Sequence, residues 1–344
     1  MRALTRLRSL GIRTCATACS LALLLIASQA SAQLTAADWS GSPMADSNIA
    51  PAGFAVAPCG FCEDDGCCSE CEDLSCSYGP CDCCPRMTLF QWSYGTSFEG
   101  GAPLDEPLVT DRPDFTEAST TVGRGVNQIE MGYTYVYDSE GGTSTRSQTY
   151  PEVLWRRGFL AEWLEFRMAW TYNEERVSTG AVNNTVSDSE DLYLGFKIAL
   201  TPQECWLPEM ALLPQMTVPL GGPFSAGEVL PGLNWLYSWE LNDNWSLAGS
   251  TQANRAIDSV TANAYTELAQ SIATGVSLTE CVGAYAEWYA FFPTGADTET
   301  NEHYLNGGFT YLMNNDVQFD VRVGYGLNSA ADDYFVGTGV SIRN

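Results

Sequence analysis

Apolar and polar residues alternate along much of the chain between Val126 and Asn344. From 317 to 325, for example, every second residue is Val, Phe or Tyr, with Gln, Asp, Arg and Gly between them. A two-residue period indicates β-strands with one apolar and one polar face. The pattern predicts an all-β, antiparallel fold of about 12 strands, with 10 to 14 possible. The predicted strands span about 126–137, 145–155, 160–172, 190–201, 210–220, 232–241, 245–256, 264–278, 282–292, 303–313, 317–327 and 333–343.

The connections between these strands are alternately short and long. Short links follow the strands that end near residues 155, 241, 278 and 313, whereas longer polar loops, such as 173–188 and 221–231, follow the strands between them. Transmembrane barrels of bacterial outer membranes have short periplasmic turns, longer outer loops, and strands whose residues face lipid and lumen in turn. The chain is therefore predicted to be an antiparallel transmembrane β-barrel in outer-membrane lipid, with both termini periplasmic. The link 201–209 is long for a periplasmic turn and departs from this rule.

Charged residues lie opposite bands of Leu, Phe, Ile and Trp in strand after strand. A soluble sandwich or closed barrel also alternates, but aromatic residues recur here near strand ends, as in the interfacial girdles of membrane barrels. The charges are then predicted to line a lumen, where they orient dipolar solutes and set ion preference, or pair across a packed interior; the sequence leaves both open. The predicted lumen-lining residues are Glu130, Glu165, Arg167, Asp191, Lys197, Glu240, Glu267, Glu287, Asp320 and Arg322.

The first 32 residues have the pattern of an export signal. Four arginines lie within the first 13 residues, an apolar run spans 21–27, and an Ala-Ser-Ala site ends at Ala32. This order predicts a secretory signal peptide over 1–32, cleaved after Ala32. Residues 33–107 show little alternation and are predicted to form an irregular, Cys-rich periplasmic extension, and 108–344 are predicted to form the barrel.

A dense block of cysteines lies within this extension. Two of its Cys-x-x-Cys pairs resemble metal-binding pairs, but they lie closer together than a zinc ribbon allows. Exported thiols meet oxidising conditions, which favours disulfides over metal. The block holds an odd number, so one cysteine is left for a partner in the barrel or in another envelope protein. The disulfide candidates are Cys59, Cys62, Cys67, Cys68, Cys71, Cys76, Cys81, Cys83, Cys84, Cys205 and Cys281.

Acidic residues strongly outnumber basic ones. The chain has 42 Asp and Glu against 16 Lys and Arg, a formal net charge of −26, and Lys197 is its only lysine. Phosphate binding relies on Lys and Arg, so nucleic acid is not expected as a partner. His303 is the only histidine, and motifs of hydrolases, metalloproteases and phosphate-binding loops are missing from the sequence. We therefore predict a protein that is not an enzyme and needs no cofactor.

A polar motif precedes the first predicted strand. Residues 110–117 read Thr-Asp-Arg-Pro-Asp-Phe-Thr-Glu. Asp111, Arg112, Pro113 and Asp114 are predicted to form a clasp on the barrel rim, in which Arg112 makes a forked pair with a carboxylate. A ligand site built from the same residues is the alternative.

This motif, followed at once by a Tyr-rich strand, resembles the family of outer-membrane transporters labelled for a "MetA pathway of phenol degradation". The resemblance covers about 108–344, and the closing run 336–343 is similar to the way family members end. It implies a β-barrel and the passage of small organic or aromatic compounds. The chain departs from bacterial barrels that end in an aromatic residue, because its last residue is Asn344.

These observations lead to two functional hypotheses. The first is a passive outer-membrane channel or transporter for small organic solutes, aromatic ones included, a class that the family resemblance implies. The alternative is a structural or adhesive envelope protein, whose barrel anchors the disulfide-linked Cys-rich segment.

Overall fold

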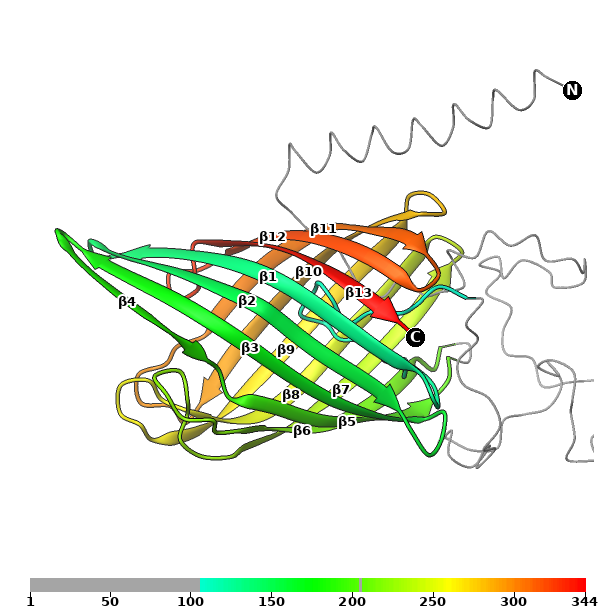
Figure 1. The fold of residues 1–344 in the computed structure, drawn as a ribbon, viewed down its shortest axis with the longest axis horizontal. Helices are drawn as coiled ribbons and strands as arrows, with labels where there is room; N and C mark the ends of the chain where they lie inside the picture. The colour runs from blue at the N-terminus through cyan, green and yellow to red at the C-terminus, as the bar shows by residue number, and fades with distance from the viewer. Residues whose placement is uncertain (1–105, 204–205) are drawn as a thin grey trace, which may run out of the picture.

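The computed structural model describes residues 106–203 and 206–344, and these form a single closed antiparallel sheet (Figure 1). No helix among these residues is long and apolar enough to span a membrane. The strands are β1 (Asn127–Glu140), β2 (Thr143–Gly158), β3 (Leu164–Thr179), β4 (Val182–Ser189), β5 (Leu192–Thr201), β6 (Glu209–Val218), β7 (Leu230–Asn242), β8 (Trp245–Ile257), β9 (Ala264–Ser277), β10 (Val282–Thr294), β11 (Glu302–Asn314), β12 (Val317–Gly326) and β13 (Tyr334–Arg343).

The sheet closes because β1 pairs with β2 on one edge and with β13 on the other, while β2 also pairs with β3. Neighbouring strands otherwise follow chain order from β5 to β13. Twelve strands make the ring, as the alternation predicted, and β4 is an extra strand outside it. The chain therefore folds as an outer-membrane-type β-barrel.

The loop predicted at 173–188 is instead a hairpin. It is formed by the end of β3 and by β4, which pairs with β3 alone between Tyr172 and Thr179. Along the first residues of β3, from Leu164 to Ala169, β5 pairs with the same edge. The hairpin extends beyond the ring (Figure 1). Both of its faces are polar, so no two-residue period marks it in the sequence.

The alternation separates two faces as predicted. Ile129 and Phe319 on the outer face are 41% and 44% exposed, whereas Glu130 and Asp320, their next neighbours in sequence, are 0% and 2% exposed. Such a surface suits lipid outside and a polar interior. The short links lie at one end of the barrel together with the C-terminus, and the long loops lie at the other (Figure 1). We call these the turn end and the loop end.

A segment without strand structure fills part of the lumen. We call residues 107–126 the plug. It enters at the turn end, where the Leu108 N–H donates to the Asn315 carbonyl at 2.8 Å, and it returns there, where the Asn127 N–H donates to the Asn344 carbonyl at 2.8 Å. The predicted barrel domain therefore begins with an inserted segment, and its first strand begins at Asn127.

The residues predicted to form a rim clasp lie inside the barrel, in the plug. Asp111, Pro113 and Asp114 are buried, and Arg112 is partly buried. The motif therefore does not lie on the rim, as was predicted. It lies in the lumen because side chains of the barrel wall are its charged partners. The predicted signal peptide and the cysteines from Cys59 to Cys84 lie outside the described residues, as does Cys205. Cys281 is exposed in the link between β9 and β10.

Candidate functional site

The centre of the plugged lumen is one carboxylate surrounded by three cations. Asp111 lies 2.8 Å from Arg167, 2.9 Å from Lys197 and 3.2 Å from Arg156, measured between carboxylate oxygens and side-chain nitrogens. The three cations come from β2, β3 and β5, and all four side chains are buried. Buried charges are costly unless they are paired, so the barrel wall requires the plug carboxylate to neutralise these cations.

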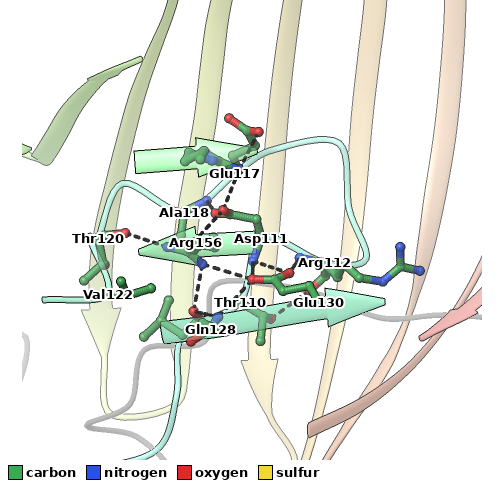
Figure 2. A network of polar contacts seen from close by, with 12 residues as sticks. Thr110, Asp111, Arg112, Glu117, Ala118, Thr120, Val122, Gln128, Glu130 and Arg156 are labelled. Atoms are coloured by element: carbon green, nitrogen blue, oxygen red, sulfur yellow. Dashed lines mark hydrogen bonds and ion pairs between the residues drawn. The ribbon is translucent and has the colours of Figure 1, made fainter. Parts of the chain in front are cut away.

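Three further carboxylates balance the same cations. Glu165 accepts two hydrogen bonds from Arg156, at 2.8 and 3.0 Å, and Glu130 accepts one at 3.1 Å. Glu117, from the plug, lies 2.9 Å from Arg167. Figure 2 shows Arg156 lying between Asp111 and Glu130. The network is nearly neutral, which explains how so many charges are buried together.

The wall also holds the plug backbone. Glu130 accepts hydrogen bonds from the N–H groups of Asp111 and Arg112, at 3.1 and 2.9 Å, and Glu165 accepts one from Val122 at 2.8 Å. Bonds from neutral donors to a carboxylate are stronger than those between neutral groups. The plug is thus anchored by its main chain as well as by Asp111.

Arg112 fits a slot where β1 meets β13. Gly132 and Gly339 are cross-strand partners, and a Cβ on Gly132 would lie 2.2 Å from the Arg112 guanidinium carbon. The guanidinium reaches Glu152 at 2.6 Å and Asp320 at 3.4 Å. Only glycine leaves room for this contact, because it has no Cβ.

The plug tip lies against an aromatic surface. The Phe115 ring stacks on Tyr289, with centroids 4.6 Å apart and planes 11° apart, and Tyr289 stacks on Tyr304 at 4.8 Å. Phe291 meets Phe115 edge-on at 5.3 Å, and Phe335 meets Tyr304 in the same manner at 6.2 Å. We call Tyr289, Phe291, Tyr304 and Phe335 the aromatic wall. It belongs to β10, β11 and β13, in the half of the barrel toward the loop end.

Carboxylates flank the aromatic wall. Below it, Glu287 accepts hydrogen bonds from the N–H groups of Phe115 and Thr116, at 2.9 and 2.7 Å. Above it, the Tyr304 hydroxyl donates to Glu302 at 2.8 Å and accepts from the Asp332 N–H at 3.2 Å. Burial, and then the charge of Asp138, raise the pKa of Asp332, which lies in the loop before β13. The loop end of the lumen is therefore acidic and aromatic.

The residues predicted to line the lumen fall into two groups. Glu130, Glu165, Arg167, Lys197, Glu287, Asp320 and Arg322 contact the plug or its partners. Asp191 instead accepts bonds from Leu220 and Ala226 in a long loop. Glu240 is exposed near the turn end, and Glu267 is partly buried beside Tyr265, away from the plug.

Sequence reasoning missed other wall residues. Arg156 was assigned to a short link, because the second strand was predicted to end one residue before it; it faces the lumen in β2. Glu152 lies four residues earlier on the same strand face, and it binds Arg112. Continuing the two-residue period through the end of that strand would have found Arg156.

The closed ring of twelve antiparallel strands around a buried charged plug defines the class, an outer-membrane-type β-barrel. The model of the family described as "Putative MetA-pathway of phenol degradation" matches residues 110–343, and the chain belongs to this family. No curated protein matches the chain.

One solved structure has a similar fold, and two others show a weaker likeness. An outer membrane channel from Pseudomonas putida F1 is 12% identical, with a TM-score of 0.52 over 67% of this chain and 99% of that one. The CymD monoaromatic hydrocarbon channel is 11% identical, with a TM-score of 0.36 over 64% of this chain and 88% of that one. The translocator domain of the autotransporter NalP from Neisseria meningitidis is 13% identical, with a TM-score of 0.44 over 64% of this chain and 88% of that one.

Proposed function

We propose that the protein is a passive outer-membrane channel for small organic solutes, including monoaromatic ones. The observation that carries this proposal is the aromatic wall, which lies inside the lumen toward the loop end. These rings pack against Phe115, and they are also surfaces on which an aromatic solute can stack. Membership of a family named for phenol degradation supports the same function.

The charged plug network gives this channel a narrow passage. Asp111 and its cations occupy the turn-end half of the lumen. Solutes then pass beside the plug or after it shifts, so that size and charge are both selected. The acidic residues near the wall favour cations over anions among small ions.

The test is reconstitution of the purified full-length protein in planar bilayers and in liposomes. We expect small conductance steps, cation preference in the reversal potential, and faster uptake of phenol than of an aliphatic alcohol of similar size. Protein-free liposomes measure the passive background for each solute. Conductance and uptake equal to that background would refute the channel.

The second candidate is an envelope anchor for the chain that precedes the plug. It is favoured by the buried charge network, which holds the plug as a fixed part of the barrel. Disulfide-linked complexes with other envelope proteins, together with no conductance, would select this function.

A further inference from the structure

We infer that the Phe115 side chain occupies a ring-binding site of the barrel, and that an uncharged monoaromatic solute entering from the loop end takes its place. This inference rests on the proposed channel function and names the solute class and the contact that a solute must replace.

The site belongs to the barrel rather than to the plug. Tyr289 and Phe291 are in β10 and Tyr304 is in β11, and these rings contact one another independently of Phe115. The Phe115 ring adds one parallel partner on Tyr289 and one edge contact with Phe291. Offset stacking and edge-to-face contacts are the arrangements that aromatic rings prefer. A solute ring of the same size can make both contacts.

The ring can leave without expelling the plug. The backbone on both sides is held separately, since Glu287 binds the N–H groups of Phe115 and Thr116, and Arg322 donates to the Pro113 carbonyl at 2.8 Å. Thr116 is fully buried, at 0% exposure, whereas Phe115 is only partly buried. A rotation of the Phe115 side chain therefore frees its place while every backbone anchor remains.

The charges around the site favour an uncharged solute. Glu287 lies on the turn-end side of the aromatic wall, and Glu302 and Asp332 contact the Tyr304 hydroxyl on its loop-end side. One cation is also near, since the Arg322 guanidinium lies 5.3 Å from the Phe335 ring centroid, where it donates to the Pro113 carbonyl and the Thr134 hydroxyl. Three carboxylates against one guanidinium that is already hydrogen-bonded leave the site acidic, so a benzoate is disfavoured. A phenol hydroxyl, in contrast, can donate to a carboxylate. The geometry points to neutral phenols and similar monoaromatic compounds.

The test measures equilibrium binding of radiolabelled phenol to the full-length protein in lipid nanodiscs, with empty nanodiscs subtracted. Phe115→Ala removes the competing ring, so the phenol dissociation constant should fall by roughly threefold to tenfold. Tyr289→Leu removes the wall ring and should weaken phenol binding. Benzoate should compete poorly in all of these proteins. Val122→Ala is the matched control, because it trims a plug residue far from the aromatic wall and should leave phenol binding unchanged.

The inference is overturned if Phe115→Ala binds phenol as weakly as the parent protein or more weakly, or if benzoate competes as well as phenol. Phe115→Leu keeps most of the side-chain volume without a ring, and it serves the same comparison if the alanine variant does not fold. Binding is measured without flux, so the two proposals fail separately. A parent protein that transports solutes but shows no Phe115 effect refutes only this inference, whereas binding without transport refutes the channel.

Discussion

Asp111 and Arg167 lie 2.8 Å apart, and their side chains are 3% and 0% exposed, although one belongs to the plug and the other to β3. Asp111→Ala would leave Arg167 and its two neighbouring cations without their shared carboxylate. Breaking a buried ion pair by removing one partner costs about 3 to 5 kcal/mol. We expect the free energy of unfolding, measured by urea titration of Trp fluorescence in lipid vesicles, to fall by about this amount.

The exposed pair Arg255–Glu228 is the control for this variant. Its side chains are 42% and 47% exposed, so Glu228→Gln should change the free energy of unfolding by less than about 1 kcal/mol. Equal effects of the two substitutions would contradict the anchoring role of Asp111.

Lys197 reports whether the plug is in place. It is the only lysine in the sequence, and its side chain is 0% exposed with Nζ 2.9 Å from Asp111. An amine-acetylating reagent should therefore modify Lys197 slowly in the parent protein. Replacing residues 108–122 by a Gly-Ser linker should accelerate the modification, as measured by peptide mass spectrometry. Equal rates would show that the plug does not shield this side chain.

The slot for Arg112 predicts a coupling between two positions. Gly132→Ala places a methyl group where the guanidinium lies, so Arg112 must leave its contacts with Glu152 and Asp320. The substitution should therefore destabilise the parent protein and cost less in an Arg112→Ala background. A coupling energy of about 0.5 to 3 kcal/mol is expected from the double-mutant cycle. If the effects of the two substitutions are strictly additive, Arg112 does not occupy this slot.

The hairpin of β3 and β4 should be dispensable for closure of the barrel. Replacing residues 175–186 by Asn-Gly removes most of β4 and the pairs that residues 175–179 make with residues 143–147 of β2, but it keeps the pairs of β3 with β5 and those of β2 with β3 from Glu152 to Gly158. We expect the barrel still to close, with the free energy of unfolding lowered by no more than about 3 kcal/mol. The heat-modifiable mobility of the folded barrel on gels gives the same comparison. Failure to fold would mean that the hairpin guides assembly.

Acid should break the hydrogen bonds that join the loop after β8 to the loop before β11. Asp258 accepts hydrogen bonds from the backbone of its own loop and, at 2.7 Å, from the Thr298 N–H of the loop before β11. These donors, with that of Thr261 foremost, hold the pKa of Asp258 below its ordinary value. A carboxylate of this kind contributes fully above its unfolded-state pKa of about 3.9, and its contribution declines as the pH falls below that value.

Hydrogen exchange of the Thr298 amide measures this effect. After correction for intrinsic exchange, protection should be constant from neutral pH down to about 4 and should then decline. Asp258→Asn should show low protection throughout. If protection of the Thr298 amide is unchanged at low pH in both proteins, Asp258 does not hold the two loops together.

The strands are predictable from sequence because the two faces of a barrel wall meet different environments. Lipid outside and polar groups inside impose a period of two, and this period alone assigns Glu130, Glu165 and Lys197 to the lumen face. The plug has no period, since each of its residues meets a different wall partner. The motif of the plug therefore indicates charged contacts but not where in the barrel they lie, and Asp111 was expected on the rim. The hairpin of β3 and β4 was missed for a related reason, because polar residues predominate on both of its faces.

The pairing of β1 with β13 means that the two ends of the barrel sequence meet at the Arg112 slot. The plug precedes β1 in the chain, so it is made before every strand of the ring, and β13 is made last. The pairing of Gly132 with Gly339 belongs both to the closed ring and to the seat of Arg112, so a correctly seated plug and a closed barrel share one contact.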